Sequence, residues 1–111
     1  MKGLDECRLN RLYLRDAMEV ISGKWKLVIL QVLNFKSFRF KELARELDIS
    51  PRMLSKELRD LEISGLVSRT VLETKPMSVD YAITEYGKTL NGVSSSIRNW
   101  GKDHRVKVIS S

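Results

Sequence analysis

Residues 50–61, with the sequence SPRMLSKELRDL, restrict the possible folds more than any other segment of the chain. Ser50 is a typical N-cap, and Pro51 suits the first helical position, where its missing N–H costs nothing. At about 100° per residue, a helix that begins here has a polar face and an apolar face on opposite sides. The polar face carries Arg52, Ser55, Lys56 and Arg59, the apolar face carries Leu54, Leu58 and Leu61, and the flanks carry Glu57, Asp60 and Glu62.

The segments around this helix predict a helix-turn-helix followed by a hairpin. A short helix, KELARELD, and the turn DIS precede it, and Gly65 is a suitable residue to end it. After Gly65 the hydrophobic period changes from helical to two, first in LVSRTVLE and then in SVDYAIT, where Val79, Tyr81 and Ile83 share one face. The turn TKPM lies between these strands. This order is typical of a winged helix, and it makes the helix from Ser50 the candidate recognition helix.

Helical periods also flank this region. Leu14, Ala17, Met18 and Ile21 follow the i, i+3, i+4, i+7 spacing, which predicts an N-terminal arm and amphipathic helix over about residues 7–22. After SGK, the segment from Trp25 to Leu33 is apolar almost all round and is expected in the core. Thr84 is expected to cap a last helix over about residues 84–107. The prediction is a single domain, residues 1–111, mainly α with a small β-hairpin, in the order α-α-α-α-β-β-α.

The charge balance restricts the class of partner. The chain has 20 basic and 14 acidic residues and a net charge of +6, which favours a polyanionic partner such as nucleic acid or an anionic membrane surface. No apolar run is long enough to span a membrane, and the acidic N-terminal segment does not fit a signal peptide, so a cytoplasmic location is expected. A role at a membrane surface is disfavoured, because no predicted helix pairs a basic face with an exposed apolar face. Cys7 has no second cysteine for a disulfide, and no Cys/His cluster predicts a metal site.

The basic side chains are best explained by binding to double-stranded DNA. The alternative is a solvated helix face, since charged faces are common. DNA is favoured because the helix is second in a helix-turn-helix, its acidic residues avoid the basic sector, and the hairpin turn carries Lys75. The predicted DNA-binding residues are Arg39, Ser50, Pro51, Arg52, Ser55, Lys56, Arg59, Arg69 and Lys75.

Apolar stripes on the first and last helices predict a homodimer. A spacing of three and four residues over several turns is what a helix–helix contact needs, although packing on the same domain is the alternative. The first helix also carries more apolar groups than a small core covers. The predicted interface consists of Leu9, Leu12 and Tyr13 with Tyr86, Leu90, Val93, Ile97 and Trp100.

Catalysis has no candidate residues in this sequence. No nucleophile–base pair and no glycine-rich phosphate loop is present, so neither an enzyme nor a cofactor is expected. Trp25 and Trp100 are expected to be packing residues, and His104 is expected on the surface.

The chain resembles the HxlR family of winged-helix transcriptional regulators, which are related to the MarR group. The stretches that carry the resemblance are GKWKLVILQVL from Gly23, RFKELARELDISPRMLSKELRDLEISGLVSR from Arg39, and VDYAITEYGKTL followed by IRNWG. It covers about residues 7–104. It implies a dimer formed by the N- and C-terminal helices, with the helix from Ser50 in the major groove and the TKPM wing along the minor groove.

The resemblance also implies a candidate redox or electrophile sensor. Several family members sense oxidants through a cysteine just before the first helix, and Cys7 stands at that place. Many members have proline after that cysteine, whereas this chain has Arg8. Two functions remain open: a sequence-specific regulator that binds an inverted-repeat operator, and a winged helix used as a protein-interaction module in a transcription complex. A cysteine without a task is likewise the alternative to a sensor.

Overall fold

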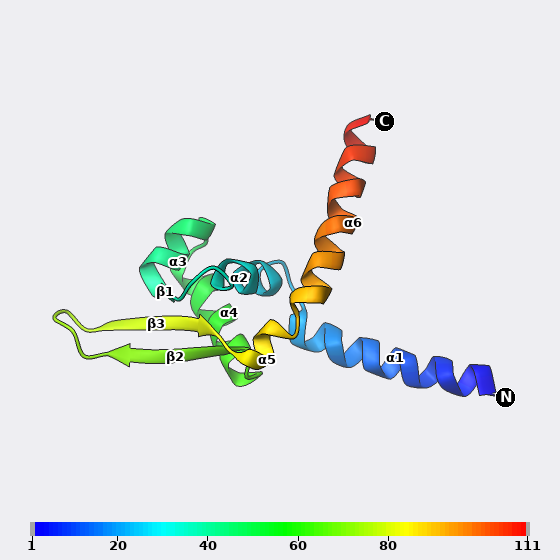
Figure 1. Ribbon diagram of the computed structural model, residues 1–111, viewed down its shortest axis with the longest axis horizontal. Coiled ribbons are helices and arrows are strands. Elements are labelled where there is room, and N and C mark those ends of the chain that lie inside the picture. The colour runs from blue at the N-terminus through cyan, green and yellow to red at the C-terminus, as the bar shows by residue number, and fades with distance from the viewer. Residues whose placement is uncertain (1, 111) are drawn as a thin grey trace.

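The computed structural model describes residues 2–110 and confirms a mainly helical winged-helix fold with a small antiparallel sheet (Figure 1). The elements in chain order are α1 (Lys2–Ile21), α2 (Lys26–Leu33), β1 (Phe38–Arg39), α3 (Phe40–Leu47), α4 (Pro51–Ile63), β2 (Val67–Leu72), β3 (Ser78–Ile83), α5 (Glu85–Lys88) and α6 (Asn91–Ser110).

The sheet has one strand more than the sequence predicted. Its order is β1-β3-β2, all neighbours being antiparallel, and Phe38 lies opposite Tyr81. The predicted order was wrong in leaving out β1, because this short strand lies in the polar and aromatic connection NFKSFRF and has no period of its own. Its extended conformation depends on pairing with β3, which is distant in the sequence.

The apolar face of α4 forms the centre of the core, as predicted. The side chains of Leu54, Leu58 and Leu61 have relative exposures of 0%, 1% and 0%. They pack with Ile29 and Leu30 of α2 and with residues of α3 and the sheet. Burying each such leucine contributes about 1.5–3 kcal/mol, so this face fixes the position of α4 against the body.

The two ends of α4 also follow the prediction. The Met53 N–H donates to Ser50 Oγ at 3.2 Å, which satisfies one amide of the first turn, and Pro51 occupies the first turn. At the other end the Ser64 N–H donates to the Asp60 carbonyl at 3.0 Å, and Gly65 has φ of +76°. A glycine fits this left-handed conformation without steric cost, so α4 ends there.

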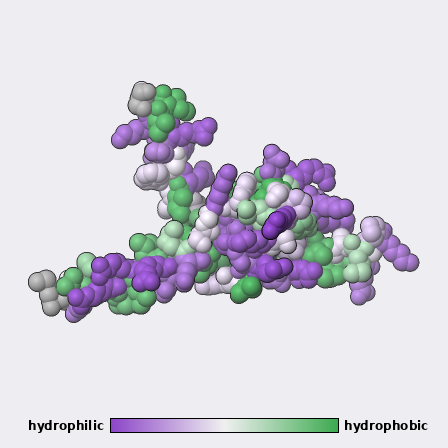
Figure 2. Space-filling model, turned by 180° about the vertical axis from the view of Figure 1, so that it is seen from behind, coloured by the Kyte–Doolittle hydropathy of each residue, from purple (hydrophilic) through white to green (hydrophobic). Residues whose placement is uncertain are grey.

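Helices α1 and α6 project from the body as two arms (Figure 1). Residues 3–19 of α1 are exposed, and α6 contains no buried residue. The radius of gyration is 17.0 Å, whereas a compact domain of this length has about 13 Å. Apolar side chains nevertheless lie along both arms (Figure 2). The arms therefore carry apolar surface that this chain leaves uncovered.

The prediction of one continuous helix over about residues 84–107 was wrong. Thr84 does cap a helix, since the Gly87 N–H donates to its Oγ1 at 2.9 Å, but that helix is the short α5. Thr84 Oγ1 also donates to the Gly65 carbonyl at 2.7 Å, and this bond ties α5 to the end of α4. The chain turns at Thr89 and Leu90, and α6 then leaves in another direction.

The N-terminal helix also differs from its prediction. It begins at Lys2 rather than near residue 7, and Cys7 therefore lies inside α1 instead of just before it. The period of Leu14, Ala17, Met18 and Ile21 identified only its C-terminal part. The earlier turns carry many charged residues, which weaken an apolar period but are good helix formers.

We expect Gly87→Ala to lower the free energy of unfolding by about 1–3 kcal/mol, because an added Cβ overpacks a closed contact. That Cβ would overlap the Leu66 carbonyl oxygen and lie 2.7 Å from Ile83 Cγ1. Gly92→Ala is the matched control, since nothing lies within 4 Å of its added Cβ. Urea unfolding of both variants checks this, and equal stability of the two would contradict the tight packing of α5.

Candidate nucleic-acid interface

The turn between α3 and α4 sets the angle of the candidate recognition helix. Asp48 ends α3 with φ of +51°, a left-handed conformation that a short polar side chain tolerates. The next residue, Ile49, is buried, and its N–H donates to the Ala44 carbonyl at 3.1 Å. Ser50 then caps α4. The buried Ile49 thus anchors the turn to the core, while Asp48 and Ser50 on either side of it stay exposed.

The predicted basic face of α4 is exposed. Arg52, Ser55, Lys56 and Arg59 all lie on the side opposite the buried leucines, and the first turn contains no carboxylate. Ser50 and Pro51 are exposed at the N-terminal end of the same helix. The structure therefore brings six of the predicted DNA-binding residues together on one helix.

The three remaining predicted residues lie outside α4. Arg39 is exposed at the junction of β1 and α3, where its N–H donates to Glu42 Oε1 at 3.1 Å. That hydrogen bond lowers the pKa of Glu42. Arg69 is exposed on β2 opposite Tyr81, so it shares the sheet face that packs on the helices. Lys75 is exposed at the tip of the β2–β3 hairpin, far out from the helices (Figure 1).

A buried ion pair lies beneath α4. Lys26 of α2 and Glu57 of α4 each have a relative exposure of 6%, and Lys26 Nζ lies 2.8 Å from Glu57 Oε2. The same ammonium lies 3.3 Å from Asp60 Oδ2 and donates to the Ser22 carbonyl at 3.3 Å. Burial acts to lower the pKa of Lys26, but its two carboxylate partners outweigh this effect and raise it. The hydrogen bond from Lys26 is in turn the main cause that lowers the pKa of Asp60.

This ion pair was not predicted from the sequence. Glu57 was predicted on a flank of the helix with Asp60 and Glu62, whereas its side chain is buried and pairs with Lys26. A signal was nevertheless present: Lys26 is the single charged residue of KLVILQVL, a segment predicted to be central to the core. A lysine in such a helix needs a buried partner, although the sequence does not say which carboxylate supplies it.

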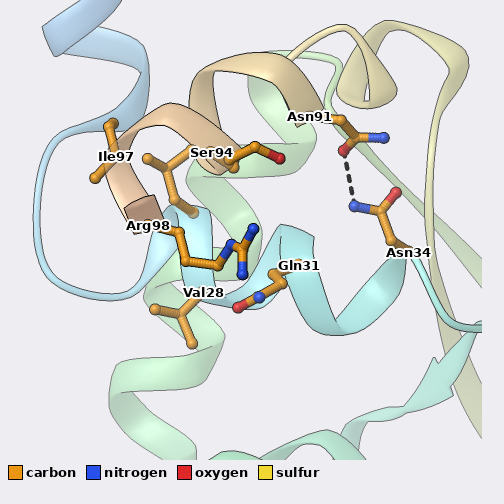
Figure 3. Close-up of a pocket in the computed structure, with 9 residues that line it drawn as sticks. Val28, Gln31, Asn34, Asn91, Ser94, Ile97 and Arg98 are labelled. Atoms are coloured by element: carbon orange, nitrogen blue, oxygen red, sulfur yellow. Dashed lines mark hydrogen bonds between the residues drawn. The ribbon is translucent and has the colours of Figure 1, made fainter. Parts of the chain in front are cut away.

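An open groove of about 650 Å³ lies between α2 and the first turns of α6 (Figure 3). Asn34 Nδ2 donates to Asn91 Oδ1 at 2.7 Å at one end of the groove and links the two helices there. Val28 and Gln31 line it from α2, and Ile97 and Arg98 line it from α6. The groove was not predicted, because it depends on the separate direction of α6.

Most of the predicted dimer residues are uncovered on the two arms. On α1, Leu9 and Leu12 are each 48% exposed, and on α6 the Trp100 side chain stacks on His104 with ring centroids 5.0 Å apart. Leu90 differs, because it packs partly against the core of its own chain. The exposed members of the predicted set are Leu9, Leu12, Tyr13, Tyr86, Val93, Ile97 and Trp100.

Two further properties concern cofactors and membranes. Within residues 2–110, no group of three or more histidine, cysteine or acidic side chains is placed to hold a metal ion. None of the helices described is both long enough and apolar enough to cross a bilayer.

A helix-turn-helix with an exposed basic second helix and a β-hairpin wing defines a winged-helix DNA-binding protein. A family model described as HxlR-like helix-turn-helix matches residues 20–108, and the chain therefore belongs to the HxlR family. Two similar proteins of Bacillus subtilis (strain 168) are HTH-type transcriptional regulators. YtcD is 41% identical over 82% of this chain and 73% of its own length, and YybR is 37% identical over 79% and 71%.

The chain is also similar to solved structures of transcriptional regulators. The reduced form of the redox regulator HypR has a TM-score of 0.79 at 34% identity, covering 88% of this chain and 98% of its own. The reduced form of the regulator YodB from B. subtilis has a TM-score of 0.71 at 32% identity, covering 79% and 87%. A MarR-family regulator from Enterococcus faecalis V583 has a TM-score of 0.76 at 34% identity, covering 91% and 93%. The chain is a helix-turn-helix transcriptional regulator of the HxlR type.

We expect Lys26→Met to lower the free energy of unfolding by about 3–5 kcal/mol, because it leaves Glu57 buried without its main partner. Lys26→Met combined with Glu57→Met removes both charges and should recover most of that loss. Lys41→Met, an exposed lysine of α3, is the control and should change stability by less than about 0.5 kcal/mol. Guanidinium unfolding measures all three. A single variant as stable as the control would show that the pair does not hold α4.

Proposed function

We propose that this protein is a homodimer that regulates transcription by binding an inverted repeat in double-stranded DNA. The observation that carries the proposal is the two-sided α4, whose leucine face is buried while its arginines and lysine face solvent. In this arrangement α4 enters the major groove and the tip of the β2–β3 hairpin reaches the minor groove. The function needs no catalysis, and it places the protein with the chromosome in the cytoplasm.

We expect the arginines and the lysines to contact different parts of the DNA. Arg52 and Arg59 are suited to bidentate hydrogen bonds with guanine edges, which specify sequence. Lys56 on α4 and Lys75 on the wing are suited to phosphates, which position the protein without reading bases. Arg39, at the junction of β1 and α3, and Arg69, on β2, are exposed and would add phosphate contacts. Ser50, Pro51 and Ser55 let the N-terminal part of α4 approach the DNA closely.

The exposed apolar arms support the dimer. Side chains such as Leu12 on α1 and Ile97 on α6 are about half exposed in one chain, and a second copy would cover both arms. A two-fold dimer presents two copies of α4. Both enter the major groove on one side of the duplex if they lie about one helical turn apart, ~34–36 Å, so the operator should be an inverted repeat with that spacing or a multiple of it.

Cys7 is the proposed sensor of oxidants or electrophiles. It is exposed on α1, and Arg11 lies one turn away on the same side of the helix. Arg8 adds a second guanidinium, although Asp5 lies 3.6 Å from it. The similar structures include HypR, a redox regulator solved in reduced and oxidised forms, and YodB, also solved after diamide treatment. Modification of Cys7 in the arm would alter the spacing of the two recognition helices.

We expect Arg52→Ala to relax sequence preference by about 1–3 kcal/mol, because a base-edge contact is lost. Lys75→Ala should instead weaken binding to every duplex and lower the slope of log affinity against log salt by about one. The measurement is the affinity of each variant for operator and for random duplex at several salt concentrations. If Lys75 alone changed the sequence preference, the roles of helix and wing would be reversed.

The same salt titration separates DNA binding from the alternative role as a protein-interaction module. A regulator that neutralises several phosphates loses affinity steeply as salt rises. Wild-type protein that binds no duplex even at low salt would favour the protein-interaction role.

We expect Ile97→Asp to convert the dimer to a monomer, because it places a charge in an apolar helix–helix contact. Footprints should then shrink from two half-sites to none at the same protein concentration. Asn99→Asp introduces the same charge on the opposite side of α6 and should leave the dimer intact. Sedimentation velocity measures the assembly state. A dimeric Ile97→Asp variant would remove α6 from the interface.

We expect peroxide to change the operator affinity of wild-type protein but not of Cys7→Ser. Peroxide transfers one oxygen to the Cys7 thiolate and leaves as hydroxide, and a second thiol can then displace water from the sulfenic acid to form a disulfide. Because the chain has no second cysteine, that thiol belongs to the other subunit or to a small molecule. A reductant should restore the original affinity. Cys7 modified in full with unchanged binding would show that it is not a switch.

A further inference from the structure

Four charged side chains form a connected cluster under and along α4, and the functional roles assigned above use only one of them. The charge cluster consists of Lys26, Lys56, Glu57 and Asp60. Lys26 is the buried lysine of the cluster, with its Nζ 2.8 Å from Glu57 and 3.3 Å from Asp60. Lys56 is the exposed lysine, with its Nζ 3.3 Å from Asp60 and 3.6 Å from Glu57. Both lysines therefore contact the same two carboxylates.

The two lysines hold these carboxylates with unequal strength. The Lys26 side chain is 7% exposed and Lys56 is 65% exposed, so water screens the contacts of Lys56 far more than those of Lys26. The direction of the Asp60 pKa agrees, since its hydrogen bond from Lys26 is the largest cause that lowers it. Lys56 can thus leave its carboxylates at little cost, provided that Lys26 remains.

Without Lys26, the two carboxylates would be held by Lys56 instead. The cluster has two cations and two carboxylates, so Lys56 would become the one cation within ion-pair distance of both acids among residues 2–110. An approaching phosphate would then compete with an uncompensated pair of carboxylates for the same ammonium, and those carboxylates would also repel the DNA. A buried carboxylate left without a partner is strongly unfavourable.

We propose that Lys26 is a positioning residue for DNA binding: it acts as the internal counter-charge of α4, neutralising Glu57 and Asp60 so that Lys56 is available to a DNA phosphate. This inference rests on the proposed function of α4. It assigns Lys26 a role beyond fold stability, although Lys26 lies behind the helix and does not touch the DNA. It also explains how a recognition helix tolerates two carboxylates beside a phosphate-binding lysine.

The test compares the effect of Lys56→Ala in three backgrounds: wild type, Lys26→Met/Glu57→Gln, and Lys26→Met/Glu57→Gln/Asp60→Asn. The two engineered backgrounds both lack the buried pair, so any shift of α4 affects them alike. They differ only in whether Asp60 is charged and able to hold Lys56. The probe is a random-sequence duplex, with affinity measured between 50 and 200 mM salt, and circular dichroism verifies that each variant is folded.

In the wild type, Lys56→Ala should lower the salt slope by about one, which corresponds to roughly a threefold smaller loss of affinity over that range. In Lys26→Met/Glu57→Gln its effect should fall to less than half, because Asp60 already holds Lys56. In the third background the full effect should return. Replacing Asp60→Asn there with Glu62→Gln removes a carboxylate of the same helix outside the charge cluster, and this control should not restore it.

An equal effect of Lys56→Ala in all backgrounds would overturn the inference and leave the proposed function intact. Wild-type protein without salt-dependent affinity for the duplex would overturn the proposed function and, with it, this inference.

Discussion

The burial of the leucine face of α4 is the constraint on which the other features depend. Leu54, Leu58 and Leu61 are packed against α2, α3 and the sheet, and a helix has only one opposite side. Once these leucines are inside, the rotation of α4 about its axis is fixed and the basic residues face solvent. The serine cap and the left-handed Asp48 then fix where the helix begins. The accessible face is therefore a consequence of the core rather than a separate feature of the surface.

The same core explains why the arms remain open. A body of this size covers one side of α2, α3 and α4, but within residues 3–21 of α1 only Val20 and Ile21 are not exposed, and α6 contributes no buried residue. Each arm still carries apolar side chains at helical spacing, which are unfavourable in water. One chain thus presents the exposed basic face of α4 together with apolar surface that it leaves uncovered. Under the proposed function, a second copy would cover that apolar surface and would set the distance between the two copies of α4.

Local signals predicted the part of the fold that carries the candidate site. The cap at Ser50, the stop at Gly65 and the change of period act within a few residues, so α3, the turn, α4 and the hairpin followed from the sequence. Features that depend on contacts with residues distant in the sequence were not predicted. Strand β1 exists because β3 pairs with it, α5 separates from α6 because Gly87 docks beside Leu66, and Lys26 finds Glu57 across 31 residues of chain. The exposed basic face of α4 was therefore predicted, whereas the buried ion pair between Lys26 and Glu57 behind it was not.

Lys26 links the N-terminal arm α1 to helix α4. Besides its carboxylates, Lys26 Nζ bonds the Ser22 carbonyl, one residue beyond the end of α1. The ammonium thus contacts the residue that follows α1 and the inner side of α4 at once. Ile21, the last residue of α1, is buried at the same junction, so the core and the hydrogen bond from Lys26 together hold the end of this arm. A change in the direction of α1 would therefore have to move both.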